Sequence, residues 1–128
     1  MHFTGTALSL LLALPLPLAN PCASGEIGIG YTVFTSIGTG PGGPGPTHVD
    51  STIFADNCDT LDNAADRSNF CTASWSDGYG TSCYENDALS VLVPGQLYFP
   101  CYKPSGNGLC GNFLFGHAQV FFCCQKLG

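Results

Sequence analysis

Apolar and small residues alternate over residues 25–34. Every second position carries a large apolar side chain: Ile27, Ile29, Tyr31 and Val33. This period of two is typical of an extended strand with one buried face. The glycines of the run do not indicate a phosphate-binding loop, because the run neither follows a strand nor opens a helix. We therefore expect a first β-strand here.

Residues 36–48 have a composition that disfavours regular structure. They contain five glycines and three prolines, with almost nothing to bury. Proline removes a backbone donor, and glycine and proline together mark turns and loops. We expect an exposed loop, which is either a flexible connection or part of a binding surface.

An acidic segment follows, with carboxylates spaced three or four residues apart: Asp56, Asp59, Asp62 and Asp66. Asp59 is a candidate cap for one or two turns of helix. Calcium loops need oxygen ligands at alternating positions and a glycine bend, which this spacing lacks. We interpret the segment as a solvated acidic face.

The second half of the chain resembles a β-meander in its pattern. Predicted strands lie at 70–75, 79–84, 89–93, 96–102 and 112–124, the last broken at Gly116, with turns at 76–78, 94–95 and 105–108. Pro94–Gly95 is the strongest turn signal, because proline presets the first central φ and glycine takes the positive φ of the second.

These patterns predict a mainly β fold. We expect a small disulfide-stabilised β-sandwich or β-barrel-like single domain with at most one short helix. The 128 residues contain no internal repeat and no second composition block. A chain of this length has room for one domain.

Residues 1–19 are predicted to be a signal peptide. An apolar core over residues 7–14 is followed by a segment without charged side chains that ends at the small Ala19. The core is shorter than the ~20 residues of a membrane span. Cleavage before Asn20 keeps every cysteine, whereas cleavage after Ala23 would remove Cys22 and leave an odd number. We expect a secreted, extracellular domain at residues 20–128.

The chain has eight cysteines: Cys22, Cys58, Cys71, Cys83, Cys101, Cys110, Cys123 and Cys124. No two of them have the Cys-x-x-Cys spacing typical of zinc sites, so we expect no metal and no cofactor. In a small secreted domain an even set predicts disulfides, here four, each stabilising by ~2–4 kcal/mol.

One constraint on the pairing comes from two adjacent cysteines. Cys123 and Cys124 follow an apolar run, and successive strand side chains point to opposite faces. The two sulfurs should therefore reach different partners. Cys22, near the predicted mature N-terminus, is a reasonable partner for one of them.

The charge balance excludes two classes of function. Three basic residues stand against nine acidic ones, giving a net charge of −6. Nonspecific nucleic-acid binding relies on lysine and arginine, and so does attraction to anionic membranes. We expect neither nucleic acid nor membrane as a partner.

Aromatic residues are concentrated in the predicted strands, where a buried core is the default interpretation. An exposed aromatic stripe that binds a glycan or a protein is the alternative. A phenol tolerates both water and apolar contact. The candidate binding residues are therefore Tyr79, Tyr84, Tyr98 and Tyr102.

Few residues offer catalytic chemistry. General acid/base cleavage of RNA needs a base, an acid and a cation, and the candidates are His48 or Glu85, His117, and Arg67 or Lys103. The order His48, Glu85, His117 resembles the guanyl-specific microbial ribonucleases. Those enzymes place an arginine between the glutamate and the second histidine, whereas here only Lys103 lies there. We interpret the histidines as non-catalytic.

A second resemblance covers about residues 52–125. It rests on Phe70-Cys71-Thr72, Ser76-Asp77-Gly78, Cys83, Pro100-Cys101-Tyr102, Cys110-Gly111 and Cys123-Cys124-Gln125. These features resemble small cysteine-rich secreted proteins of filamentous fungi, including effector-like and elicitor-like ones. The resemblance implies secretion, a disulfide-locked β-rich fold and action at a host or cell surface.

The leading hypothesis is thus a non-enzymatic, secreted effector-like protein that binds an unidentified host protein or cell-wall glycan. The alternatives are a structural or surface-coating secreted protein, and a small secreted ribonuclease or toxin. Hydrophobins also have eight cysteines, but with two Cys-Cys pairs, whereas this chain has a single pair at its end. We therefore do not expect a film-forming protein of the hydrophobin type.

Overall fold

The structure is a computed structural model that describes residues 20–35, 47–65, 69–113 and 116–127. All regular structure in these ranges is β, which confirms the mainly β prediction. The strands are β1 (Ile27–Thr35), β2 (Thr47–Phe54), β3 (Thr60–Ala64), β4 (Gly80–Tyr84), β5 (Asp87–Val93), β6 (Gln96–Tyr102), β7 (Leu109–Phe113) and β8 (Gly116–Lys126). The predicted signal peptide and residues 36–46 of the predicted loop lie outside the described residues.

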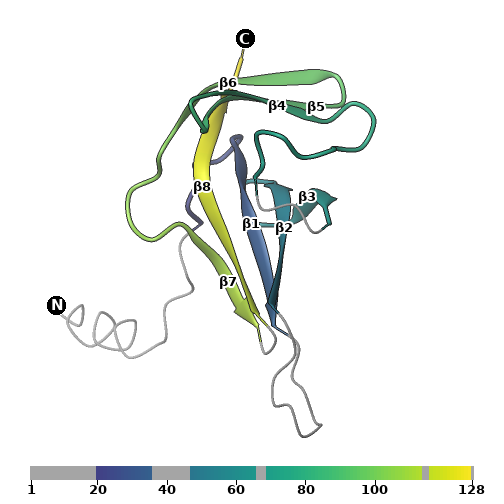
Figure 1. The fold of residues 1–128 in the computed structure, drawn as a ribbon. Helices are drawn as coiled ribbons and strands as arrows, with labels where there is room; N and C mark the ends of the chain where they lie inside the picture. Colours follow the sequence, from purple (N-terminus) through teal and green to yellow (C-terminus); the bar gives the residue numbers. More distant parts are fainter. Residues whose placement is uncertain (1–19, 36–46, 66–68, 114–115, 128) are drawn as a thin grey trace, which may run out of the picture.

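The strands form one antiparallel sheet that curls into a half-barrel (Figure 1). Their order is β3-β2-β1-β8-β6-β5-β4, with β7 paired to β8 off this path. The eleven-residue β8 is the central strand. It pairs with β1 along one side, and with β7 and then β6 along the other.

The two faces of β1 bury different clusters. Ile27 and Ile29 pack on the inner face with buried residues from β2, β5 and β8, and Tyr31 packs against them. This confirms the predicted alternation of the first strand. On the outer face, Phe54 and Val120 pack with a disulfide. Both faces of the central strands therefore carry buried residues.

A β-bulge in β8 changes this alternation. Ile29 pairs with Phe122 and the next residue, Gly30, pairs with Val120, so Phe121 is the extra residue. A bulge re-aims a side chain, and here Phe121 and Phe122 both contact Phe70 on the inner face. Two consecutive aromatic rings thus lie on the same side of the sheet.

Several predicted turns and strands are confirmed. Gly95 has a φ of 81°, as the Pro94–Gly95 turn requires, and β6 covers the predicted range. The Tyr79 amide donates to the Ser76 carbonyl at 2.9 Å, which closes the predicted turn at 76–78. The turn between β4 and β5 uses positive φ values at Glu85 and Asn86.

The predicted helix near Asp59 is wrong. Residues 60–64 form β3, which pairs with β2. Asp59 closes the preceding turn instead, since its amide donates to the Asn57 side chain and its carbonyl accepts from the Ala55 amide. The same short polar side chain can cap a helix or close a turn. At Asp59 the pairing of residues 60–64 with β2 excluded the helix and left the turn.

The predicted strand at 70–75 is also wrong, and β2 was not predicted from the sequence. Phe70 belongs to a turn that Asn69 caps, and the Phe70 carbonyl accepts from the Thr81 hydroxyl at 2.7 Å. Side chains therefore bind backbone groups that a neighbouring strand would otherwise pair. Thr47 and His48, assigned to the loop from the sequence, begin β2.

Four disulfides link the described cysteines, as predicted. They are Cys22–Cys123, Cys58–Cys110, Cys71–Cys83 and Cys101–Cys124. The adjacent Cys123 and Cys124 reach different partners, and Cys22 is one of them. Multiple disulfides in so small a domain are typical of extracellular proteins.

Candidate functional site

A pocket of about 400 Å³ opens on the inner face of the half-barrel. The turn between β4 and β5, the loop between β6 and β7, and the bulged part of β8 surround it. Its floor is aromatic and its rim is polar. Ligand sites commonly combine an apolar lining with a few convergent polar groups.

Four aromatic residues form the floor: Tyr31, Phe70, Phe121 and Phe122. The Tyr31 ring lies 5.3 Å from Phe70 and meets Phe121 edge-on at 5.1 Å, measured between centroids. These are favourable separations for aromatic pairs. Phe121 is 43% exposed, so the bulge presents a large ring to a ligand.

The wall between β6 and β7 is fixed to the sheet by its backbone. The Val120 amide donates to the Gly108 carbonyl at 2.7 Å, and the Gln119 side chain donates to the Asn107 carbonyl at 2.9 Å. A Cβ on Gly108 would lie 2.2 Å from the Val120 carbonyl oxygen. Only glycine allows this approach, so the wall is preformed.

The rim carries one positive and one negative side chain, Lys103 and Asp87. The Lys103 ammonium lies 5.9 Å from the centroid of Phe122, within the range of a cation–π contact. Burial raises the pKa of Tyr31, against the opposing effect of a backbone hydrogen bond from Phe70. The Tyr31 phenol is therefore neutral in ordinary physiological conditions.

The four tyrosines predicted as binding residues do not form one stripe. Tyr79 and Tyr98 are half-buried and pack against the inner core. Tyr84, at the end of β4, is 66% exposed. Tyr102 lies at the end of β6 and opposes Cys123, so it belongs to the outer face.

The Tyr102 hydroxyl donates to the Glu26 carboxylate at 2.5 Å. This hydrogen bond is the main cause that raises the pKa of Tyr102 to about 12, with desolvation and the charge of Glu26 adding to it. Glu26 also accepts from the Ala23 amide at 2.9 Å.

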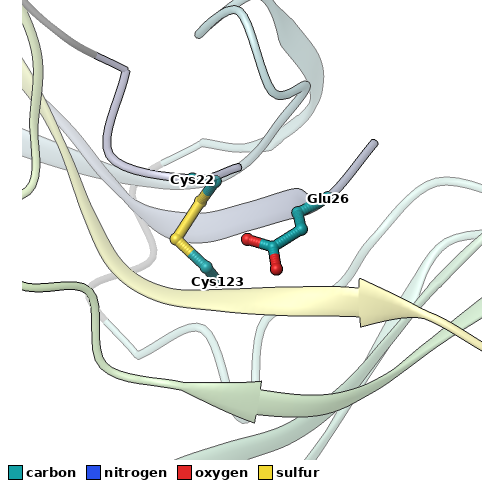
Figure 2. Close-up of side chains that lie close together, drawn as sticks. All are labelled: Cys22, Glu26 and Cys123. Atoms are coloured by element: carbon teal, nitrogen blue, oxygen red, sulfur yellow. A yellow bond between two sulfur atoms is a disulfide. The ribbon is translucent and has the colours of Figure 1, made fainter. Parts of the chain in front are cut away.

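Cys22, Cys123 and Glu26 bring possible metal-ligating atoms within 4.8 Å of one another. Figure 2 shows that the two sulfurs are bonded to each other. Metal ligation by cysteine requires the thiolate. This cluster is therefore a disulfide beside a hydrogen-bonded carboxylate, and it does not fit a metal centre.

The residues considered for RNA cleavage are not brought together. His48 opposes Phe34, and His117 opposes Val33, the preceding residue of β1. Neighbouring strand residues point to opposite faces, so the two histidines lie on opposite faces of the sheet. Glu85 is in the turn between β4 and β5, at the other end of the strand order. Arg67 lies outside the described residues.

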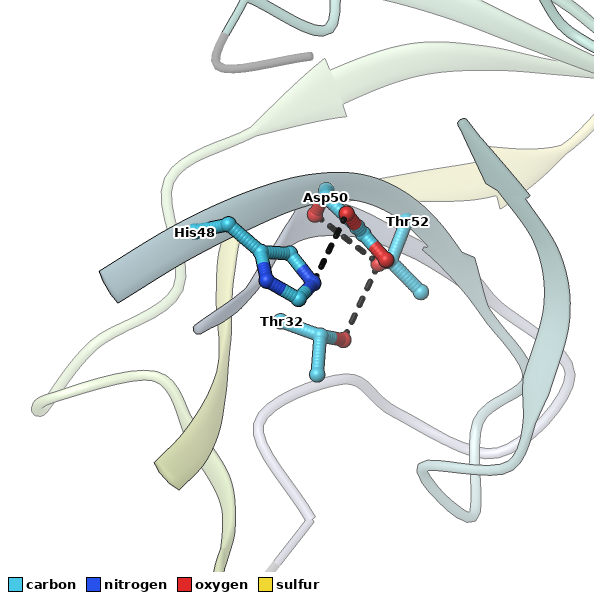
Figure 3. Close-up of polar contacts among 4 residues, drawn as sticks. All are labelled: Thr32, His48, Asp50 and Thr52. Atoms are coloured by element: carbon cyan, nitrogen blue, oxygen red, sulfur yellow. Dashed lines mark hydrogen bonds and ion pairs between the residues drawn. The ribbon is translucent and has the colours of Figure 1, made fainter. Parts of the chain in front are cut away.

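His48 takes part in a structural polar cluster instead. Its Nε2 lies 3.7 Å from the carboxylate of Asp50, a largely buried side chain. Thr52 donates to the Asp50 carbonyl, and its hydroxyl shares a hydrogen bond with Thr32 at 3.0 Å (Figure 3). The His48 ring also stacks on Phe34.

The acidic segment does not gather its carboxylates either. Asp56 accepts from the Gly25 amide at 2.7 Å, and Asp59 accepts from Asn57. Asp62 accepts from both the amide and the hydroxyl of Ser76. Each described carboxylate thus holds a different loop. Asp66 lies outside the described residues.

Comparisons with protein-family models, with curated proteins and with solved structures find no significant match. The described residues include no helix long and apolar enough to cross a membrane. The assignment of a site therefore rests on geometry. The sequence did not predict the pocket. The adjacent Phe121 and Phe122 are the feature of the sequence that could have indicated it.

Proposed function

We propose that this is a secreted, effector-like protein of a filamentous fungus that acts outside the producing cell by binding a host protein or glycan. Four disulfides in a small domain support the extracellular part of the proposal. The inner-face pocket supports the binding part. The pocket replaces the separate tyrosines as the proposed site.

The single observation that carries the proposal is the exposed Phe121 ring, which lies on an aromatic floor held in a rigid frame. Phe121 is presented by a bulge, and Phe70 is the neighbour of Cys71, which is bonded to Cys83. Gly108 fixes the wall between β6 and β7. A preformed site loses little conformational entropy when a ligand binds.

The positions of the histidines favour binding over hydrolysis. General acid/base catalysis needs both groups within reach of one bond. His48 and His117 cannot meet this condition from opposite faces of the sheet. The ribonuclease alternative therefore has no support from these residues.

Infiltration of the purified protein into plant tissue tests the proposal. We expect a host response to the native protein, its loss in Phe121→Ala and its retention in His117→Ala. Thermal midpoints close to that of the native protein must first show that both variants fold. A response that survives Phe121→Ala but disappears in His117→Ala would contradict pocket binding, as would RNA digestion by the native protein.

A second candidate function, surface coating, is favoured by the outer face of β5 and β6. Leu92 and Leu97 oppose each other there and are exposed, and so are Phe99 and Leu127. The Leu127 amide donates to the Leu97 carbonyl, which places the chain end beside β6. Exposed apolar side chains that gather on one face mark a surface that associates with another molecule or phase.

Surface tension separates the two candidates. A coating protein should lower the surface tension of water, and Leu97→Ser together with Leu92→Ser should weaken this effect. Under the binding proposal, the same double variant leaves the host response unchanged.

A further inference from the structure

We propose that the inner-face pocket binds a carbohydrate, with one sugar ring stacked on Phe121 and its hydroxyl groups held by the polar rim. This inference rests on the proposed binding function and names the ligand class for the same site. The size of the pocket, its aromatic floor, its polar rim and its charges support it.

The size of the pocket limits the ligand. About 400 Å³ lies near the lower end of the ~300–1,000 Å³ range of small-molecule sites. A space of this size accepts roughly one or two sugar-sized rings, with the rest of a chain extending into solvent. It is too small for a folded protein segment.

The floor offers one exposed apolar ring, that of Phe121. Regular alternation would turn either Phe121 or Phe122 away from the pocket, and the bulge keeps both on the inner face. The Phe122 side chain is buried, whereas the Phe121 side chain is 43% exposed. A sugar ring has an apolar C–H face that suits such a ring, and the contact requires no charge on the ligand.

The rim offers groups that both donate and accept hydrogen bonds. Side-chain amides border the pocket at Asn86, Asn107 and Gln119. An amide has two donor hydrogens and an acceptor oxygen, which matches the mixed donor and acceptor character of sugar hydroxyls. Asn86 lies on the turn between β4 and β5 and Asn107 on the loop between β6 and β7, so the rim amides come from separate segments of the chain.

The charges disfavour other ligand classes. Lys103 already places an ammonium over Phe122, so a cationic ligand would be repelled there. A phosphate ligand would be attracted by a single lysine only, because the pocket also contains Asp87 and the protein has a net charge of −6. Asn107 and Gln119 already use part of their hydrogen-bonding capacity within the loop. A lipid tail would cover their remaining polar groups and Asn86 without offering them a partner, and burying unpaired polar groups is costly.

The test is a titration with defined oligosaccharides, followed by chemical shifts or calorimetry. The panel contains β-1,4-linked oligomers of glucose, xylose and N-acetylglucosamine, and α-1,4-linked galacturonic acid. We expect at least one of them to bind. Phe121→Ala should weaken that binding roughly tenfold or more, whereas Phe121→Trp, which keeps an aromatic platform, should retain it.

Tyr84→Ala is the matched control, because it removes an exposed aromatic side chain outside the pocket. It should leave sugar binding unchanged. Binding of no oligomer, or binding that Phe121→Ala does not weaken in a folded variant, would overturn the ligand class. A Phe121-dependent host response without sugar binding would overturn this inference and leave the proposed function standing. Loss of both would overturn both.

Discussion

Gly108 holds the loop between β6 and β7 against β8. Its φ of 70° lies in the left-handed region, and an added Cβ would lie 2.2 Å from the Val120 carbonyl oxygen. We expect Gly108→Ala to lower the free energy of unfolding by more than the ~1–2 kcal/mol that the left-handed conformation costs by itself. Denaturant unfolding measures this change.

Gly106→Ala is the control for this prediction. Gly106 has a similar φ of 83°, but a Cβ there would have no atom within 4 Å. It therefore has the conformational cost without the clash. Equal losses of stability in the two variants would show that close contact with Val120 does not fix the loop.

The hydrogen bond between Tyr102 and Glu26 makes a pH-dependent contribution to stability. The pKa of Tyr102 is raised to about 12 in the folded protein, above the usual value of 10.0. A raised pKa means that the neutral phenol is favoured by folding. The stabilisation is therefore fully present below pH ~10 and is lost as the pH rises from ~10 to ~12.

Ultraviolet titration of the phenolates measures this effect directly. Tyr102→Phe should remove the component near pH 12, and Glu26→Gln should move it toward pH 10. Tyr31, whose pKa is raised by burial, should be unaffected in both variants. An unchanged titration curve in Glu26→Gln would contradict the assignment.

At the scale of elements, the sequence predicted those turns and strands best whose conformation is set by adjacent residues. The β5–β6 hairpin follows from Pro94–Gly95, since both backbone angles of the turn are properties of those two residues. The strand after it was predicted with the bounds that the structure has. Such a turn can be predicted from its own residues without knowledge of the fold.

The strands β2 and β3 were missed because their pairing depends on distant residues. Thr52 is fully buried, and its hydroxyl needs Thr32, twenty residues earlier, as a partner. A buried polar residue resembles a surface residue in the sequence. The following segment has the polar composition of a turn or a helix start, and pairing with β2 made it a strand.

The pocket could not be predicted because it depends on a one-residue irregularity. Without the bulge, Phe121 and Phe122 would point to opposite faces of β8. The bulge arises from how β8 pairs with β1, which the sequence pattern does not show. Phe121 was correctly assigned to a strand, while its exposure was not foreseen.

The segment before β4 is held by a disulfide rather than by strand pairing. Cys71–Cys83 closes a loop with a sequence separation of 12, for which loop entropy predicts about 3 kcal/mol of stabilisation. We expect Cys71→Ala with Cys83→Ala to lower the unfolding free energy by about that amount. Because Phe70 lines the pocket, ligand binding should weaken as well.

Two measurements check this prediction. Thermal unfolding reports the loss of the bridge, and titration with whichever oligosaccharide binds the native protein reports the pocket. Full binding in the folded double variant would show that the bridge stabilises the fold without positioning Phe70.

At the scale of the whole molecule, the adjacent cysteines join the two faces of the sheet. Cys123 is bonded to Cys22 on the outer face, and Cys124 to Cys101 on β6. Strand alternation alone predicted that their partners differ. The remaining pairs could not be predicted, because they depend on loops that come together only in the folded chain.

Mass spectrometry of the protein secreted by an expression host tests the leader and the bridges together. We expect a chain that begins at Asn20 and is lighter by eight hydrogens than its reduced form, because each of the four disulfides removes two. A non-reduced peptide map should link the Cys123–Cys124 peptide to two others, containing Cys22 and Cys101.

The two possible failures have different meanings. A retained leader would contradict secretion and leave the fold intact, since the described strands begin after it. Partial reduction and alkylation of the linked peptide then assigns the two bridges, because Cys123 and Cys124 stay in one peptide. A link from Cys22 to Cys124 would contradict the register of β8, because it would exchange the inner and outer faces at Cys123 and Cys124. That exchange would also move Phe121 relative to the pocket, so the peptide map tests the proposed site before any ligand is added.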